Sequence, residues 1–190
     1  MKCLTCFNFS FSLICKKCQQ LFLTPNIKRK TLKNDVIVYS FYRYSDIENL
    51  LKSKYKVYGS TIYKILAKNS FETFAKEFDF DSKVFAIPID DNVNRNFSHS
   101  AILTKSLKSK YITPLYGELR ATNRVQYAGK SKSFRENNPR GFKYSAKDGI
   151  DIILVDDIIT YGVTLNEAID ALKKHNVNIL FALTLANTID

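Results

Sequence analysis

The sequence predicts an α/β fold with a central, mostly parallel sheet flanked by helices, together with a small N-terminal module built on four cysteines. Three observations support this prediction. The last third of the chain alternates strand, helix and strand patterns, and residues 36–44 and 84–89 form further runs typical of strands. All cysteines lie within the first 18 residues. A chain of 190 residues that is 45% hydrophobic can bury one sizeable core.

The cysteines follow the spacing C-x2-C-x8-C-x2-C, at Cys3, Cys6, Cys15 and Cys18. Two close pairs can turn four thiolates onto one ion, which favours a closed, structural tetrahedral zinc site. The alternatives are two disulfides or four idle thiols. A cytosolic setting argues against disulfides, and idle cysteines are not expected to cluster in this way. We therefore expect residues 1–23 to form a Zn²⁺-binding module that the metal orders.

The domain division predicted after this module is a connector at residues 24–35, polar and basic, followed by one domain at residues 36–190. Residues 36–44 are expected to form a strand, and residues 45–78 two helices separated by a break near Gly59. Further along, the patterns predict a buried strand, a helix and a strand interrupted at Pro114, over residues 84–89, 98–107 and 111–119. Residues 120–147 are polar and basic and show no clear pattern.

The last third of the chain gives the clearest pattern. Residues 151–157 predict a strand, and Thr164 with Glu167 fits a capping box at the start of a helix. Asn176 can end that helix in the left-handed conformation, and residues 177–185 predict the next strand. The apolar face of the helix is expected at Leu165, Ala168, Ile169 and Leu172. Two parallel strands follow, with the loop at the carboxyl end of the first, where open α/β sheets usually bind ligands.

The acidic pair Asp156–Asp157 is followed by a short loop, "IITYGV". Gly162 allows a tight turn, and the free amides at the helix start favour an anion. Thr160 and Thr164 add hydroxyl donors. The two carboxylates repel a phosphate, but they can accept hydrogen bonds from a vicinal diol or help to place a metal ion. The combination favours a ligand that carries a ribose 5-phosphate unit.

Three other interpretations of the acidic pair fit the sequence less well. A P-loop requires a Gly-Lys pair that this loop lacks. A phospho-acceptor domain carries its aspartates near its start, whereas 34 residues follow Asp156 here. The remaining alternative is two solvated aspartates that end a strand, which leaves the hydroxyl-rich loop unexplained.

These residues resemble the phosphoribosyl pyrophosphate (PRPP) signature of type I phosphoribosyltransferases. Together with the cysteines, the chain resembles the ComF family, phosphoribosyltransferase-like proteins associated with bacterial competence for DNA uptake. "AIPIDDNVNRNFSHSAILTKSL" and "ELRATNRVQYAGKSKSFRENNPRGF" resemble two further segments of that family. The sequence departs from the family pattern at Ala86, Asn96 and Tyr161, where a proline, a glycine and a small hydroxyl residue are usual.

The resemblance implies a role for each part of the site. Asp156 and Asp157 would contact the ribose 2- and 3-hydroxyls. The 5-phosphate would be bound by Thr160, Tyr161, Gly162, Val163 and Thr164, and Ile158 would be a further PRPP-binding residue. The diphosphate would lie with Mg²⁺ near Ile89, Asp90 and Arg95. His99, beside Arg95 in the family-like stretch, is either a ligand or diphosphate contact or a packing residue.

The resemblance also implies displacement at the anomeric carbon through an oxocarbenium-like state, without a covalent nucleophile. A mobile loop within residues 115–147 would close over the ligand. Arg120, Arg124, Lys130 and Arg135 are its candidates for neutralising the leaving diphosphate. Asp156, Asp157, Arg120 and Arg135 are therefore the predicted catalytic residues.

The charge distribution indicates a second, polyanionic partner. The net charge is +11, and residues 105–147 carry +9 of it. Tyrosines and phenylalanines are interleaved with the cations there, as single-strand grooves require. Lys130, Lys132 and Arg135 are the predicted nucleic-acid contacts. The alternative is that this stretch is only the closing loop for PRPP, itself an anion, together with ordinary surface.

The predicted function is that of a PRPP-binding, phosphoribosyltransferase-like protein in DNA uptake, or natural transformation. It would handle single-stranded DNA in the cytoplasm, with proteins of the uptake machinery as candidate partners. The alternative is a true phosphoribosyltransferase of nucleotide or base metabolism without a DNA role, and release of ribose phosphate by hydrolysis is a weaker third option. No apolar run approaches the roughly 18 residues of a membrane span, so no membrane insertion is expected.

Overall fold

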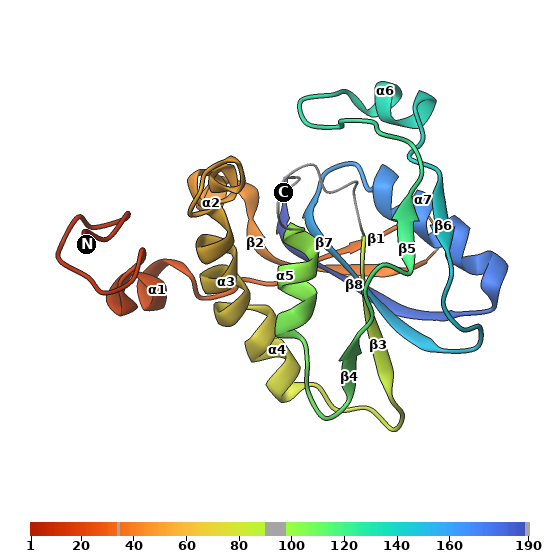
Figure 1. Ribbon diagram of the computed structural model, residues 1–190, viewed down its shortest axis with the longest axis horizontal. Coiled ribbons are helices and arrows are strands. Elements are labelled where there is room, and N and C mark those ends of the chain that lie inside the picture. The colour runs from red at the N-terminus through yellow and green to blue at the C-terminus, as the bar shows by residue number, and fades with distance from the viewer. Residues whose placement is uncertain (34, 90–97, 189–190) are drawn as a thin grey trace.

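The central feature of the computed structural model, which describes residues 1–33, 35–89 and 98–188, is a six-stranded sheet (Figure 1). The strand order is β1-β2-β8-β7-β3-β4, and every neighbouring pair is parallel except β1 with β2. The strands are β1 (Lys28–Thr31), β2 (Ile37–Arg43), β3 (Val84–Pro88), β4 (Ile112–Pro114), β7 (Asp151–Ile159) and β8 (Asn178–Asn187). The predicted α/β class with a mostly parallel sheet is confirmed.

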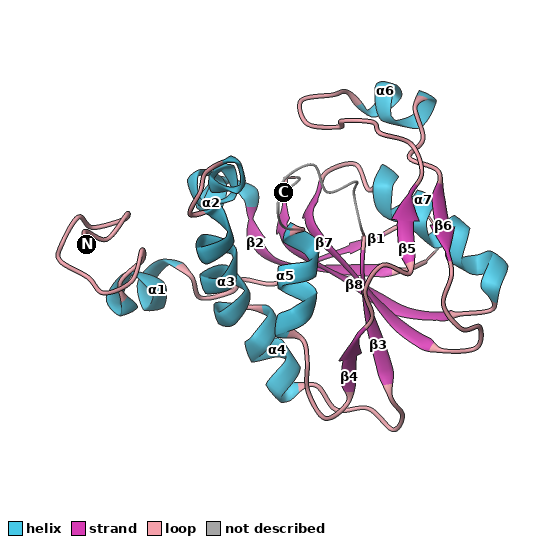
Figure 2. Ribbon diagram, viewed as in Figure 1, coloured by secondary structure: helices cyan, strands magenta, loops and turns pink. Residues whose placement is uncertain are grey.

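Helices cover both faces of this sheet (Figure 2). The larger group lies on one face, and it comprises α2 (Tyr44–Leu51), the 3-10 turn η1 (Lys52–Tyr55), α3 (Gly59–Asn69), α4 (Phe71–Glu77) and α5 (His99–Ser106). Helix α7 (Val163–Leu172) lies on the opposite face and runs into the 3-10 turn η2 (Lys173–His175). As predicted, Asn176 ends this turn in the left-handed conformation, with φ of 50°.

The segment without a clear sequence pattern folds as an antiparallel ribbon. Strands β5 (Leu119–Ala121) and β6 (Phe142–Tyr144) pair with each other, and the short helix α6 (Lys132–Asn137) lies between them in the chain. Figure 1 shows the ribbon beside α7, with α6 projecting past the carboxyl ends of the central strands. A segment that could not be assigned from sequence is therefore placed next to the loop that follows β7.

Two details of the predicted secondary structure are wrong. Residues 28–31, expected within a connector, form the edge strand β1, whose lysines and arginine alternate between half-buried and exposed positions. A lysine-rich edge strand has the composition of a linker, because charged residues protect sheet edges from further pairing. Strand β7 also continues through the acidic pair to Ile159, since residues 156, 158 and 159 keep their pairing with β8.

Strand β7 divides the core into two layers. Its side chains alternate between the faces, so Ile153 and Val155 pack in the cluster formed with α3 and α5, whereas Ile152 and Leu154 pack with α7. All four side chains are fully buried. The same alternation continues to Asp156 and Asp157. Their two carboxyl groups therefore point to opposite faces of the sheet.

The N-terminal module shares the core of the α3–α5 face. Helix α1 (Lys16–Phe22) carries Cys18, which is buried in the same cluster as Cys3, Leu23 and Tyr63. The buried hydroxyl of Tyr42 on β2 donates to the Leu23 carbonyl at 2.9 Å. The described ranges contain no helix that is both long and apolar enough to cross a bilayer.

Candidate functional site

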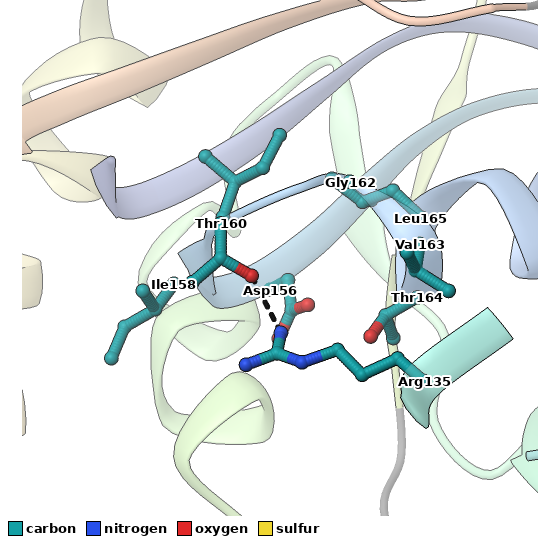
Figure 3. Close-up of a pocket in the computed structure, with 9 residues that line it drawn as sticks. Arg135, Asp156, Ile158, Thr160, Gly162, Val163, Thr164 and Leu165 are labelled. Atoms are coloured by element: carbon teal, nitrogen blue, oxygen red, sulfur yellow. Dashed lines mark hydrogen bonds between the residues drawn. The ribbon is translucent and has the colours of Figure 1, made fainter. Parts of the chain in front are cut away.

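The turn between β7 and α7, residues 160–162, has the geometry of an anion-binding loop. Gly162 adopts φ of 78°, and a Cβ at this position would approach the Leu32 side chain to 2.7 Å. Helix α7 starts at Val163, so its first free amides face the turn. We refer to residues 160–162 as the β7–α7 loop. A small pocket at this loop is lined by Arg135, Asp156, Ile158, Ile159, Thr160, Gly162, Val163, Thr164 and Leu165 (Figure 3).

The predicted capping box at the start of α7 is wrong. Gly162 occupies the capping position, and no side chain caps the helix there. Thr164 is the second residue of the helix and lines the pocket. The carboxylate of Glu167 instead accepts hydrogen bonds from the backbone N–H groups of Arg140, at 3.1 Å, and Gly141, at 2.5 Å. Glu167 therefore ties the β5–β6 ribbon to α7, a role that short-range sequence spacing could not indicate.

The two aspartates lie on opposite sides of the sheet and have different surroundings. Asp157 points toward α3 and η1, where its Oδ2 accepts hydrogen bonds from Lys54 Nζ and Tyr63 Oη, each at 3.3 Å. Burial opposes the charge of Asp157, but the Lys54 ammonium and these hydrogen bonds outweigh it and hold its pKa below the ordinary value. Asp157 is therefore ionised, with its partners fixed by the fold.

Asp156 faces the loop pocket on the α7 side of the sheet. Burial and the neighbouring Asp157 charge raise the pKa of Asp156 to about 7, although the Arg140 guanidinium and the Asp157 N–H favour its charged form. That N–H donates to Asp156 Oδ1 at 2.8 Å. Near neutral pH Asp157 is therefore negatively charged, whereas the Asp156 carboxyl can either donate or accept a hydrogen bond.

Arg135 is the cation that the fold brings to the loop. Its Nη1 donates to Thr160 Oγ1 at 2.5 Å, and its side chain projects into the pocket from α6 (Figure 3). Its other hydrogen bonds go to the carbonyls of Tyr127, at 3.1 Å, and Lys130, at 3.2 Å. From the other side, Lys30 Nζ on β1 donates to the Thr160 carbonyl at 3.0 Å. Two cations from distant segments therefore hold Thr160.

The remaining predicted residues fall into different places. Ile89 is buried at the end of β3 and donates its N–H to the Val155 carbonyl at 2.8 Å, next to the acidic pair. Arg120 lies on the exposed side of β5, where its Nε donates to the Gly117 carbonyl at 2.7 Å. It does not line the loop pocket. Asp90 and Arg95, and also Asn96, lie outside the described residues.

Three further candidate residues, on the ribbon and on α5, also do not line the loop pocket. Lys132 lies 3.7 Å from Glu136, and Arg124 is exposed. The His99 ring packs against Tyr63, with ring centroids 4.7 Å apart. Burial lowers the pKa of His99 despite the Asp157 charge, so its ring is neutral at physiological pH.

Four residues of the site were not found by sequence reasoning: Lys54, Tyr63, Arg140 and Lys30. Tyr63 and Lys54 are 94 and 103 residues away from Asp157 in the chain. They belong to helical patterns in which a lysine is expected on the surface and a tyrosine in the core. No local spacing in the sequence signals contacts of this kind, because only the packing of α3 and η1 onto β7 creates them.

The four cysteines form a compact cluster whose ligand atoms lie within 4.8 Å of one another. All four are free thiols, so the two-disulfide alternative is wrong, and the Sγ atoms of Cys6 and Cys15 are 3.8 Å apart. Four sulfurs at about 2.3 Å from a tetrahedral zinc ion would be separated by about this distance. Although burial opposes ionisation of Cys3, backbone N–H groups, including those of Cys15 and Thr5, lower its pKa to about 6. The donor set therefore fits a thiolate-binding metal ion.

Comparison with known proteins finds a family match in the C-terminal part of the chain. Residues 106–189, which include the β7–α7 loop, match the family described as phosphoribosyl transferase domain. Because this match is to phosphoribosyltransferase domains at large, the resemblance to the ComF family remains a prediction. No protein with a curated description matches the sequence.

Solved structures similar to this chain include phosphoribosyltransferases of low sequence identity. A hypoxanthine phosphoribosyltransferase from Staphylococcus aureus is 15% identical, with a TM-score of 0.43, over 66% of this chain and 62% of that one. An adenine phosphoribosyltransferase from Saccharomyces cerevisiae is 14% identical, with a TM-score of 0.43, over 89% and 86% of the two chains. An orotate phosphoribosyltransferase from Mycobacterium tuberculosis is 13% identical, with a TM-score of 0.39, over 88% and 81%.

Proposed function

We propose that this protein binds PRPP at the carboxyl end of β7 and acts as a phosphoribosyltransferase-like protein in DNA uptake, handling single-stranded DNA in the cytoplasm. One observation supports the proposal that the protein binds PRPP. Asp156 lines the same pocket as Thr160, Gly162 and Thr164, within the segment that matches the phosphoribosyl transferase family. One carboxyl group for a ribose hydroxyl and a helix start for a phosphate thereby lie in one pocket.

In this proposal each end of the ligand has its own residues. The ribose hydroxyls bind the Asp156–Asp157 pair, and the 5-phosphate binds the β7–α7 loop and the first amides of α7. The diphosphate extends toward the end of β3 at Ile89, with Mg²⁺ as its counter-ion. Oxygen-rich groups of the ligand and an ionised aspartate suit this hard cation, which would neutralise charge on the leaving group.

The chain's own contribution to a transfer reaction would be positioning and charge. Lys54 and Tyr63 fix the ionised Asp157, so this carboxylate can orient a ribose hydroxyl without rearranging. Arg135 supplies a positive charge at the loop. No covalent nucleophile is needed when the anomeric carbon is attacked by an acceptor held in line.

For the N-terminal module we propose a structural Zn²⁺ held by Cys3, Cys6, Cys15 and Cys18. The clustered thiols support this, and four protein ligands leave no open position for chemistry. The ion would stabilise the module against the α3–α5 face. We assign it no catalytic step.

The alternative function is a true phosphoribosyltransferase of nucleotide or base metabolism without a DNA role. One observation favours it, because Arg135, a cation of the basic stretch, contacts the β7–α7 loop itself. The positive charge of residues 105–147 could then serve PRPP alone. Titration of the wild-type protein with single-stranded DNA separates the two functions, since salt-dependent binding supports DNA handling and absence of binding supports the alternative.

Calorimetric titration with PRPP and Mg²⁺ tests the PRPP site. We expect binding by the wild type and at least a tenfold loss of affinity in Asp156→Asn/Asp157→Asn, about 1.4 kcal/mol or more. The control is Asp151→Asn, which removes a carboxylate at the opposite end of the same strand. Equal affinities of the acidic-pair variant and the control would show that the ribose assignment is wrong.

A further inference from the structure

A second, larger hollow adjoins the loop pocket. It has a volume of about 540 Å³ and is lined by residues that include Lys130, Arg135, Thr160, Tyr161 and Thr188. We call it the outer hollow. Ligand sites commonly measure about 300–1,000 Å³, so one nucleotide unit fits a hollow of this size. The loop pocket, in contrast, holds only about 10 Å³, room for about one water molecule.

Arg135 and Thr160 line both spaces. The Arg135 side chain projects into the loop pocket and donates to Thr160 there, as the dashed line in Figure 3 shows. The loop pocket therefore contains this hydrogen bond and little free space beside it. A phosphate that enters the loop must take over the hydrogen bond between Arg135 and Thr160, so the position of this guanidinium controls both spaces.

The charge of Arg135 is not balanced by the acceptors found for it among the described residues. All three are neutral oxygens: the Thr160 hydroxyl and the carbonyls of Tyr127 and Lys130. Lys130 also lines the outer hollow, with its ammonium 5.1 Å from the centre of the Phe134 ring. The outer hollow therefore presents positive charge to an anion, and a guanidinium binds phosphate oxygens with more than one N–H.

Tyr161 gives the outer hollow an aromatic surface. Its side chain does not line the loop pocket, and 47% of the residue is exposed. The Arg135 guanidinium lies 5.7 Å from the centre of its ring. An exposed ring next to unbalanced cations is the arrangement with which proteins bind single strands, stacking a base and neutralising the adjoining phosphate.

We propose that the outer hollow binds one nucleotide unit of single-stranded nucleic acid, with the base on Tyr161 and a phosphate on Lys130 and Arg135, and that PRPP and the strand compete for Arg135. This inference rests on the proposed function. It adds a defined place for the strand and a coupling between the two ligands. Because such coupling is reciprocal, each ligand weakens the other by the same factor.

The test is fluorescence anisotropy with a labelled oligothymidylate of about 12 nucleotides, with and without saturating PRPP and Mg²⁺. We expect Tyr161→Ser and Lys130→Gln each to weaken oligonucleotide binding about tenfold, and Tyr161→Phe to retain it. The matched controls are Tyr111→Ser and Lys110→Gln, a tyrosine–lysine pair with 4.7 Å between ammonium and ring centre, next to β4. These controls should bind like the wild type.

Saturating PRPP should raise the apparent Kd of the oligonucleotide at least fivefold. The inference is overturned if Tyr161→Ser binds like Tyr111→Ser, or if PRPP leaves oligonucleotide affinity unchanged while calorimetry shows that PRPP is bound. In both cases the proposed function survives. A wild type that binds no oligonucleotide would refute the inference together with the DNA part of the proposed function, and failure to bind PRPP would refute the competition and the PRPP part.

Discussion

At the scale of single residues, the acidic pair shows how one strand gives identical side chains different properties. Asp156 and Asp157 are neighbours, but strand alternation directs them to opposite faces. Asp157 meets Lys54 and Tyr63, which lower its pKa, whereas burial and the Asp157 charge raise that of Asp156. Near neutral pH the carboxyl end of β7 therefore avoids the mutual repulsion of two full charges.

The raised pKa of Asp156 predicts a pH dependence of stability. Between the ordinary carboxyl pKa of 3.8 and about 7, the native state retains a proton that the unfolded chain has released. Raising the pH through this window therefore lowers the free energy of unfolding. Asp156→Asn removes this effect, so its stability relative to the wild type should increase from about pH 4 to about pH 8, by at most roughly 4 kcal/mol.

Urea denaturation of both proteins across this pH range measures the difference. Wild type and variant curves that stay parallel from acid to neutral pH would contradict the assignment.

The pair itself and the hydroxyl-rich loop could be predicted from sequence, because the strand and the loop are local patterns. The different states of the two carboxyls could not, because Lys54, Tyr63 and Arg140 reach them only through tertiary packing.

At the scale of elements, α7 depends on the ribbon beside it. Glu167 accepts hydrogen bonds from two backbone N–H groups of residues 140 and 141, and Arg140 stacks its guanidinium 4.4 Å from the centre of the Tyr127 ring. The ribbon in turn carries α6 and Arg135. A side chain that spacing assigned to helix capping therefore positions the cation of the candidate site.

Glu167→Gln should loosen this connection. One amide oxygen can replace a carboxylate oxygen, but the charge and the second acceptor are lost, which costs about 1–2 kcal/mol. Hydrogen exchange at the Arg140 and Gly141 amides should accelerate, and PRPP affinity should fall because Arg135 loses its fixed position. Glu77→Gln, on the exposed end of α4, is the control. Unchanged exchange at residues 140 and 141 would show that Glu167 does not hold the ribbon.

At the scale of the whole molecule, the cysteine module is joined to the main core. Cys3 and Cys18 are buried in one cluster with Tyr63 and Leu66 of α3. The sequence could predict the module, because the four cysteines are close together in the chain. The sequence could not predict this packing. The apolar residues of α3 indicate one buried face of a helix, but they do not indicate which part of the chain packs against it.

Loss of the metal should therefore destabilise α3 as well as the module itself. Cys15→Ser/Cys18→Ser should contain no zinc by elemental analysis, lower the Tm by several degrees and increase hydrogen exchange in α3. Lys17→Ser, exposed between the same two cysteines, should keep both the metal and the Tm. Purified wild type without zinc would rule out the metal, and normal exchange in α3 would rule out the connection.

The order of strands has a consequence for how the chain is made. Strand β8 lies in the middle of the sheet, between β2 and β7, yet it is synthesised after both. While the ribosome is still extending the chain, β2 can pair with β1 but has no partner on its other edge, and β7 exposes the edge that β8 will later cover. The nascent chain therefore carries unpaired edges on two apolar strands until the last central strand emerges, which exposes it to aggregation for longer than a protein built from local pairings.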